Sequence, residues 1–439
     1  MHARTNELPS GDDNLESVYT LPKEAYVSPE FAKLERERLW PRVWQVACRE
    51  EELPRVGSFV TYDILDESVI VIRTKDDKIQ AFNNACLHRG RQLTEGCGRV
   101  QRFVCRYHGW KWNIDGSLHE VIDRQDWKGL LKDESLRLPE YACGTWGGFV
   151  FISFDPNAEP LLDYLAPIPE YLDCLEFERL RFNRYVTLEI PANWKTAQEA
   201  FTEAYHIQTT HRQAAPFMDP RSVTQGRGKH SQMSDNFPPV VGVHFGGPPG
   251  RERDAFIELV RQMAEGRSPF GARAMGAASR LRDLPEDTPY LQTAMKWIEN
   301  LKEAAIATGA GFPRATPEEL FKAGVDWTIF PNVTFVMSPD ASLWYRIRPH
   351  GDDPNRCLFD IWWLERFAAG AEPKLERQYY SKWEDFKELG PVLTQDFENI
   401  PHVQKGMRTS GFQRAIPHPV QEEGIMHFHR VLGGYLSDE

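Results

Sequence analysis

The segment CLHRGRQLTEGCGRVQRFVCRYHGW, residues 86–110, carries two pairs of metal-ligand residues. The first pair is Cys86-x-His88 and the second is Cys105-x-x-His108, so each pair combines one thiolate with one imidazole. In a zinc finger, the cysteines usually form one pair and the histidines the other. Two mixed loops can instead place both thiolates on one iron and both imidazoles on the other iron of a [2Fe–2S] centre.

Two other interpretations of this segment are a structural zinc site and a coincidence of Cys and His on a β scaffold. Cys97 lies between the two pairs and is either a decoy or a core residue. Gly90 and Gly109 fit loops in which the backbone must approach sulfur closely. The order C-x-H…C-x-x-H is the Rieske pattern. It predicts that this part of the chain relays electrons.

A second group of metal-ligand residues lies in NWKTAQEAFTEAYHIQTTH, which has helical composition. Glu203 and His206 are three residues apart and would share one face of a helix. His206 and His211 are five residues apart, which predicts that the helix ends, kinks or bulges between them. Two histidines and one carboxylate with open positions opposite form the facial triad of O₂-activating non-haem Fe(II) sites.

The third ligand of such a triad must come from elsewhere, and Asp396 in VLTQDFENIPHV is the candidate. Taken alone, a His pair on an amphipathic helix more often belongs to the core or the surface. A single Asp in a polar helix is more often merely solvated. The relay pattern in the same chain favours the metal interpretation, because an electron relay needs a destination.

With both groups in this order, the chain resembles the α subunits of Rieske non-haem iron oxygenases, the aromatic-ring-hydroxylating oxygenase family. CLHRG, CRYHGWKW, NWK, EAFTEAYHIQTTH, FPN, RIRP and a C-terminal helix with an Asp follow the family's order over nearly the whole chain. The resemblance implies an α+β protein. An N-terminal all-β Rieske [2Fe–2S] domain would precede a catalytic domain of the helix-grip (START/Bet v1-like) type, which has an antiparallel sheet.

The resemblance also implies the ligands of both metal groups. They are Cys86 with Cys105 and His88 with His108 for the two irons of the cluster, and His206, His211 and Asp396 for a mononuclear Fe(II).

Members of this family assemble as head-to-tail trimers, in which the cluster of one subunit faces the mononuclear iron of the next. The resemblance therefore implies a homotrimer of α subunits, with or without three β subunits. It assigns Glu203 as the inter-subunit electron-transfer bridge, between His206 and His108 of the neighbouring subunit, where it would fix histidine tautomers. The bridge is more often Asp in the family, and Ala200 stands where Asn is common. Glu at the bridge also occurs among members that act on quaternary amines.

The composition describes a globular protein of 439 residues with 41% hydrophobic and 12% aromatic residues. Its formal charge of −12 argues against nucleic acid as a partner. The longest apolar run, GGFVFISF, has the length of a strand, so we expect no membrane span. Seven cysteines without a secretory signal predict a cytoplasmic protein with free thiols.

The sequence divides into three parts. Residues 1–41 read as a polar tail and the helix SPEFAKLERERLWPRVW. Residues 42–155 hold short β-rich runs and a hairpin with an Asp115-Gly116 turn, and we assign them to the Rieske domain. Residues 156–439 would form the catalytic domain, in which residues 212–320 are the predicted lid over the substrate pocket.

Within the catalytic part, strands are expected at FNRYVTLEI, DWTIFPNVTFVMS, SLWYRIRPHG and CLFDIWWLERF. A long helical pattern is expected over EPKLERQYYSKWEDFKELGPVLTQDFENIPHVQKGM.

We expect the chain to be the terminal oxygenase of a multicomponent system. It has no GxGxxG within a βαβ unit and no plant-type four-cysteine cluster, so electrons from NAD(P)H must come through a separate reductase, with or without a ferredoxin. The expected reaction uses O₂ to monohydroxylate or cis-dihydroxylate a hydrophobic aromatic or polycyclic substrate. The alternative is a monooxygenase that acts on a quaternary amine or a methoxy compound.

Two rival functions lie outside oxygenation: a pure electron carrier and a carrier of lipids or other hydrophobic molecules. Neither explains both groups of metal ligands. Trp327, Phe335 and Trp344 suit either a pocket wall or, as we favour, the packing between strands. Arg346 and Arg348 could bind a substrate carboxylate or lie on the outer face of a strand.

Overall fold

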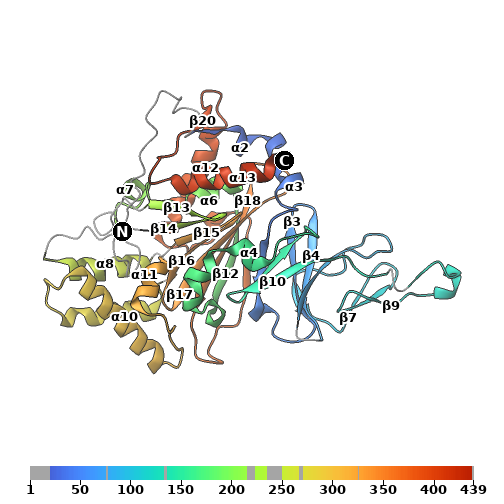
Figure 1. Ribbon diagram of the computed structural model, residues 1–439, viewed down its shortest axis with the longest axis horizontal. Helices are drawn as coiled ribbons and strands as arrows, with labels where there is room; N and C mark the ends of the chain where they lie inside the picture. The colour runs from blue at the N-terminus through green and yellow to red at the C-terminus, as the bar shows by residue number, and fades with distance from the viewer. Residues whose placement is uncertain are drawn as a thin grey trace.

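The computed structural model describes residues 20–75, 78–132, 136–214, 223–234, 250–265, 270–324 and 326–437. Most of the predicted tail (residues 1–19), the predicted turn residues Asp76 and Asp77, and segments 215–222, 235–249 and 266–269 of the predicted lid lie outside these ranges. The described chain is elongated, with an all-β region at one end and a mixed α and β region at the other (Figure 1).

The all-β region is built from short strands rich in β-branched and aromatic residues, as the sequence predicts. Its main sheet is antiparallel. In spatial order its seven strands are β2 (Gln45–Arg49), β11 (Phe149–Ser153), β10 (Glu140–Trp146), β5 (Ile79–Asn83), β4 (Glu67–Arg73), β3 (Ser58–Ile64) and β6 (Cys97–Arg99). A second sheet of three strands lies at the far end of the molecule: β7 (Arg102–Val104), β8 (Lys111–Asn113) and β9 (Leu118–Glu120) (Figure 1).

The predicted Asp115-Gly116 hairpin is present between β8 and β9. Gly116 has a φ of +80°, which a residue with a side chain rarely adopts. A Cβ atom at this position would also lie 2.7 Å from the ring of Phe82. The turn therefore requires glycine for its backbone and for its packing.

The larger region is built on a separate sheet of eight strands, and helices cover one of its faces. This confirms the predicted α+β architecture of helix-grip type. In spatial order the strands are β13 (Val223–Arg227), β14 (His230–Ser234), β15 (Asp326–Ile329), β16 (Val333–Ser338), β17 (Ala341–Pro349), β18 (Cys357–Glu365), β12 (Arg181–Ile190) and β19 (Arg377–Tyr380). Neighbouring strands are antiparallel, except that β12 and β19 pair in parallel.

Two sets of helices accompany this sheet. The first set covers it (Figure 1): α6 (Trp194–Glu199), α12 (Pro391–Met407) and α13 (Glu423–Leu436). The second set packs around the buried ring of Trp297: α8 (Glu252–Glu265), α9 (Ala272–Ser279) and α10 (Tyr290–Ala307). The predicted lid range of 212–320 also includes β13 and β14, which are part of the eight-stranded sheet.

Two predicted helices are shorter in the structure. In the NWKTAQEAF stretch, α6 ends at Glu199, because the Thr202 side chain donates to the Glu199 carbonyl and the backbone N–H groups there form tighter turns. In the C-terminal pattern, α12 begins only at Pro391, directly after Gly390, whose φ is +78°. Proline is favoured in the first turn of a helix and not inside it. The preceding residues form β19 and a single 3₁₀ turn.

The two regions of the chain pack against each other through one face of the eight-stranded sheet. Phe149 of β11 lies on Trp344 of β17, with ring centroids 3.9 Å apart, and Trp344 stacks on Phe335 at the same distance. Each such ring pair contributes about 0.5–1.5 kcal/mol beyond simple burial. Trp327, Phe335 and Trp344 are fully buried, which confirms that they are core residues.

Arg346 and Arg348 project from the same strands into this interface. The Arg346 guanidinium donates to the Asp360 carboxylate at 2.7 Å and to the carbonyl oxygens of Val46 and Ala47 at 2.8 and 2.7 Å. Arg348 donates to the Asp360 carboxylate at 3.2 Å. Both predicted roles, binding a substrate carboxylate or lying on an outer face, are therefore wrong. These arginines join the two regions.

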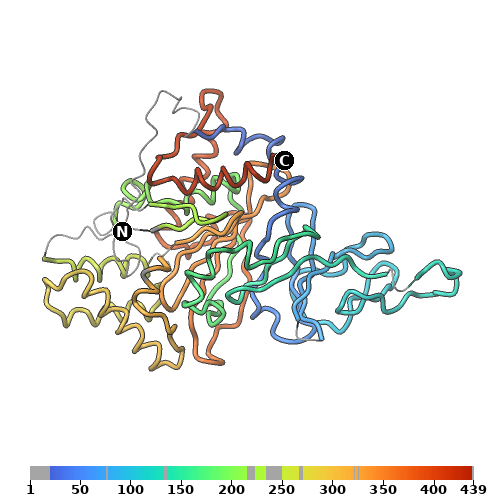
Figure 2. Tube along the Cα trace, viewed as in Figure 1, coloured from blue at the N-terminus to red at the C-terminus, as the bar shows by residue number. Residues whose placement is uncertain are grey.

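The N-terminal segment lies beside the C-terminal helices. The predicted helix is present as α3 (Pro29–Arg38), with the Ser28 hydroxyl capping its first turn. Figure 2 shows this segment running next to α12 and α13, and its Glu35 forms a buried ion pair with Lys195 of α6 at 2.5 Å. Among the described residues, every helix is too short or too polar to cross a membrane.

Candidate metal centres

The first centre lies on two loops of the all-β region, one between β5 and β6 and one between β7 and β8. Each loop has the same backbone pattern. The N–H of Cys86 or Cys105 donates to the carbonyl five residues later, and the glycine N–H four residues later donates to the cysteine carbonyl. These glycines, Gly90 and Gly109, have φ values of +74° and +70°. Two matched turns thus present one Cys and one His each.

The side chains of the first centre fit a metal group. Cys86 and Cys105 are buried, and burial raises the pKa of the Cys86 thiol, so a metal must displace its proton. The rings of His88 and His108 are 4.5 Å apart. Their Nδ1 atoms are buried and have no hydrogen-bond partner among the described residues. Two orphaned imidazole nitrogens next to two buried thiols are the donor set of a Rieske cluster.

Aromatic rings hold the outer part of this centre. His88 stacks on Trp110 with ring planes 8° apart, and the edge of Trp127 packs against both rings. Burial and the neighbouring His108 lower the pKa of His88, which keeps the ring neutral and able to bind a metal. Cys97 is exposed on β6. Of its two interpretations, the core residue is therefore wrong.

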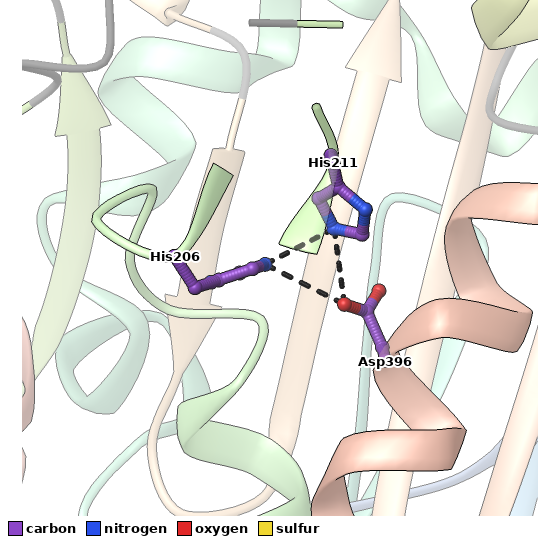
Figure 3. A group of neighbouring side chains, drawn as sticks. All are labelled: His206, His211 and Asp396. Atoms are coloured by element: carbon purple, nitrogen blue, oxygen red, sulfur yellow. Dashed lines mark hydrogen bonds and ion pairs between the residues drawn. The ribbon is translucent and has the colours of Figure 1, made fainter. Parts of the chain in front are cut away.

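The second centre brings together His206, His211 and Asp396 (Figure 3). Asp396 is far from the two histidines in the sequence. Their ligand atoms lie within 4.8 Å of one another. The Nε2 atoms of His206 and His211 are 3.5 and 3.0 Å from Oδ1 of Asp396. Two imidazoles and one carboxylate that converge in this way can hold a metal of the facial-triad type.

A break in the helix creates this geometry, as the spacing of the histidines predicts. His206 and His211 flank α7 (Ile207–Thr210), a single helical turn, as its N-cap and C-cap residues. Glu203 lies before this turn and is not helical, so it does not meet His206 across a helix face. Instead the His206 N–H donates to one Glu203 carboxylate oxygen at 3.2 Å, and Nδ1 lies 2.5 Å from the other.

A second orienting side chain is Gln395, which contacts His211. It was not predicted from the sequence. Its amide oxygen accepts from Nδ1 of His211 at 2.8 Å and from the Gln213 amide at 2.9 Å. The one available signal was its position directly before Asp396 in the sequence. Both histidines therefore direct Nδ1 toward a protein acceptor and Nε2 toward the centre of the triad.

The electrostatics of the triad favour binding of a cation. Burial alone would raise the pKa of Asp396, but hydrogen bonds from His206 and His211 hold it below its usual value. Burial also opposes a charge on His206, but its contacts with Asp396 and Glu203 raise its pKa to about 10. Without metal, His206 is thus protonated at neutral pH, and a metal must displace this proton.

A cavity of about 360 Å³ lies beside the triad. Glu203, His206 and Asp396 line it, as does Ile416, whose side chain is 73% exposed. Ala200, where the resembling family commonly has Asn, lines the same cavity. Glu203 therefore lines the same cavity as two of the candidate metal ligands, His206 and Asp396.

The two centres lie far apart within one chain. In Figure 1 the segment that contains α7 is on the opposite side of the molecule from β7, along its longest axis. A projection can only shorten a distance, so this separation is real.

Comparison with known proteins gives two matches to family models. The model described as Rieske [2Fe-2S] domain matches residues 43–130. The model described as ring hydroxylating alpha subunit (catalytic domain) matches residues 177–438.

Several curated relatives match one part of the chain. The carnitine monooxygenase oxygenase subunit of Escherichia coli (strain K12) is 32% identical over 205 residues, which are 45% of this chain and 54% of the relative. The glycine betaine monooxygenase oxygenase subunit of Pseudomonas aeruginosa (strain UCBPP-PA14) is 29% identical over 44% of this chain and 45% of the relative. The anthranilate 1,2-dioxygenase large subunit of Acinetobacter baylyi is 32% identical, over 45% and 43%. The chain thus spans about half the length of the curated relatives it matches.

Among solved structures, the quaternary ammonium Rieske monooxygenase CntA in complex with L-carnitine is similar over 95% of this chain and 96% of that chain. The TM-score is 0.66 at 19% sequence identity, so this likeness concerns the fold.

Proposed function

This chain belongs to the family of ring-hydroxylating α subunits with a Rieske domain, and we propose that it is the terminal oxygenase of a system that acts on a quaternary amine. The family gives it a Rieske [2Fe–2S] cluster and a mononuclear non-haem iron as cofactors. The observation that carries the proposal is the convergence of His206, His211 and Asp396 in a chain that also has the paired Cys and His loops.

We assign the ligands as the resemblance implies. Cys86 and Cys105 hold one iron of the cluster, His88 and His108 hold the other, and His206, His211 and Asp396 hold the mononuclear iron. When bound, the cluster supplies electrons one at a time and the mononuclear iron activates O₂.

The residues around the triad fix where the protons are. Glu203 accepts the Nδ1 proton of His206, and Gln395 accepts that of His211. Both Nε2 atoms are then free to donate lone pairs, and Asp396 adds one negative charge. A side chain that fixes a tautomer in this way also raises the basicity of its ligand.

The wide separation of the two centres favours a route for electrons between subunits. We propose a head-to-tail trimer in which Glu203 connects His206 to His108 of the neighbouring subunit. Large apolar side chains are exposed at both ends that would meet. They are Leu87, Tyr107, Ile122 and Leu130 in the all-β region, and Tyr205, Val403, Ile416 and Val420 near the triad. A separate NAD(P)H reductase, with or without a ferredoxin, would reduce the cluster.

Three observations favour a quaternary amine over an aromatic or polycyclic substrate. The carnitine and glycine betaine monooxygenases are among the relatives. The proposed bridge is Glu203, and the resemblance implies that Glu at this position also occurs among members that act on such amines. The rings that would have suited a ring-binding pocket are occupied in the core: Trp344 packs on Phe149 and Phe335, and Trp327 packs on Tyr171.

The test is a single turnover of the reduced enzyme under ¹⁸O₂ with quaternary amines, methoxy-aromatics, aromatic acids and polycyclic compounds, read by mass spectrometry. Hydroxylation of a carbon next to the ammonium nitrogen yields a tertiary amine and a carbonyl product, which must be trapped before its labelled oxygen exchanges with water. We expect this result with at least one quaternary amine. A cis-diol with two labelled oxygens from an aromatic compound, with no amine product, would overturn the assignment.

A further inference from the structure

One buried carboxylate of the eight-stranded sheet has no partner among the described residues. Asp326, the first residue of β15, is 8% exposed, and its carboxylate forms no hydrogen bond or ion pair with any described residue. The other buried aspartates of this sheet are paired: Asp340 with Arg273, and Asp360 with Arg346. A buried carboxylate without a partner is costly, so it calls for an explanation.

The register of the sheet places Asp326 on the face that carries the iron centre. Asp326 pairs with Val336, and Val336 pairs with Leu343, so all three side chains point to one face. Tyr345, two residues beyond Leu343, shares that face. Its ring packs on Phe201, which follows α6, at 4.6 Å.

This face is partly accessible beside Asp326. Val336, opposite Asp326, is partly exposed, although its neighbours on the other face are buried. Burial raises the pKa of Tyr345 well above its usual value, and the nearby charges of Asp396 and Asp326 raise it further. The charges of Asp396, a candidate metal ligand, and of Asp326 thus both act on the Tyr345 phenol.

No described cation compensates Asp326. Burial alone raises its pKa well above the usual range for a carboxyl group. A positively charged ligand would reverse this shift and recover the energy of desolvation, whereas a neutral ligand would not.

We propose that Asp326 is the anionic anchor for the ammonium group of the substrate, with the Tyr345 ring beside it. This inference rests on the proposed function. A quaternary ammonium group has no N–H to donate, so a protein recognises it by charge and by the faces of aromatic rings. Inside a water-poor pocket, one carboxylate supplies a strong attraction that a neutral ring substrate cannot use.

The test compares charged and uncharged probes of equal shape on the holoenzyme. Calorimetry under anaerobic conditions would measure the binding of choline, L-carnitine and glycine betaine, and of 3,3-dimethylbutan-1-ol, the carbon isostere of choline. We expect the wild type to bind at least one cation. Asp326→Asn should weaken that binding by roughly 10- to 100-fold, leave the isostere unchanged, and give a comparable rise in KM. Asp326→Glu should restore part of the affinity.

Stability gives a second readout. Asp326→Asn removes a buried carboxyl group whose ionised form has no described partner, so its thermal midpoint should equal or exceed that of the wild type. Asp340→Asn is the matched control, because it removes a buried carboxylate that pairs with Arg273. It should lower the midpoint and leave the preference for the cation over the isostere unchanged.

The outcomes separate the two proposals. If the wild type converts a quaternary amine and Asp326→Asn binds that amine within threefold of the wild type, the anchor is wrong and the function stands. If the wild type binds no cation and oxidises only a neutral compound, both proposals are overturned.

Discussion

The two metal centres are held in different ways. At the first, the backbone of two matched glycine turns places Cys86 and Cys105, and the ligands lie within one short segment. At the second, Asp396 comes from a distant helix, and the side chains of Glu203 and Gln395 orient the histidines. A centre whose ligands are placed by a local backbone turn has a recognisable spacing of ligand residues in the sequence. A centre that depends on side chains from distant parts of the fold has almost no such spacing.

The largest effect should come from removing one ligand of each centre in turn. His206→Ala should lower turnover by roughly three orders of magnitude or more, with the visible absorbance of the cluster intact. Cys105→Ser should abolish that absorbance and leave the mononuclear iron detectable. Metal analysis and absorbance spectra would measure both. Unchanged product formation by His206→Ala would support a different function, and loss of both signals in either variant would show that the centres fold as one unit.

The next effect tests how firmly the two regions are joined. Arg346→Met leaves the buried carboxylate of Asp360 without its main partner, so the free energy of unfolding should fall by about 3–5 kcal/mol. Urea unfolding, followed separately by cluster absorbance and by far-UV circular dichroism, would measure it. Arg356→Met is the control, because Arg356 pairs with Glu189 at the surface, where such a pair contributes about 0–1 kcal/mol. Equal losses in both variants would contradict the role of Arg346.

Glu203→Gln tests the connection between the centres. The amide keeps the shape of the side chain but cannot act as a charged acceptor for Nδ1 of His206. Transfer of electrons from the cluster should slow by roughly 10- to 100-fold while both metals remain bound. Stopped-flow absorbance of the cluster during a single turnover would measure this rate, and Glu203→Asp should recover part of it. A wild-type rate in Glu203→Gln would exclude the bridge.

Gln395→Leu removes the acceptor for Nδ1 of His211 and should lower the affinity for iron about tenfold. Titration of the metal-free enzyme with Fe(II) under anaerobic conditions would measure it. Lys405→Ala, an exposed change on the same helix, is the control. Equal affinities in the two variants would show that the backbone alone positions His211.

Acid should lower the free energy of unfolding of the larger region, because His230 of β14 is buried. Its Nε2–H donates to the Tyr164 carbonyl and its Nδ1 accepts from the Phe330 N–H. Burial lowers the pKa of His230 to about 4. As pH falls below about 6.5, the unfolded chain binds a proton that the folded chain does not, so stability is lost between 6.5 and 4.

From pH 7.5 to 5.5 this loss should be roughly 1 kcal/mol, the smallest effect considered. Urea midpoints at both pH values would measure it. His230→Gln should be less stable at pH 7.5 but less sensitive to acid. An unchanged pH dependence would exclude His230 as the cause.

Sequence patterns predicted the elements that depend on nearby residues. The mixed Cys and His spacing, the short strands of the all-β region and the break between His206 and His211 all follow from local geometry. The start of the C-terminal helix also has a local signal, Gly390 followed by Pro391, but the predicted helical pattern ran across it. The partners of Arg346 and Gln395, and the lack of a described partner for Asp326, were beyond local patterns, since each depends on which strands and helices become neighbours in space.

The eight-stranded sheet assigns alternate residues to different tasks, and this has a consequence for evolution and for engineering. One face, with Phe335 and Trp344, packs toward the all-β region, while the other, with Val336, Leu343 and Tyr345, lies on the side of Phe201 and α6. A strand can therefore acquire new side chains at every second position without disturbing the joint behind it. Libraries that vary only positions 326, 336, 343 and 345 should change substrate preference and leave the path of electrons as it is.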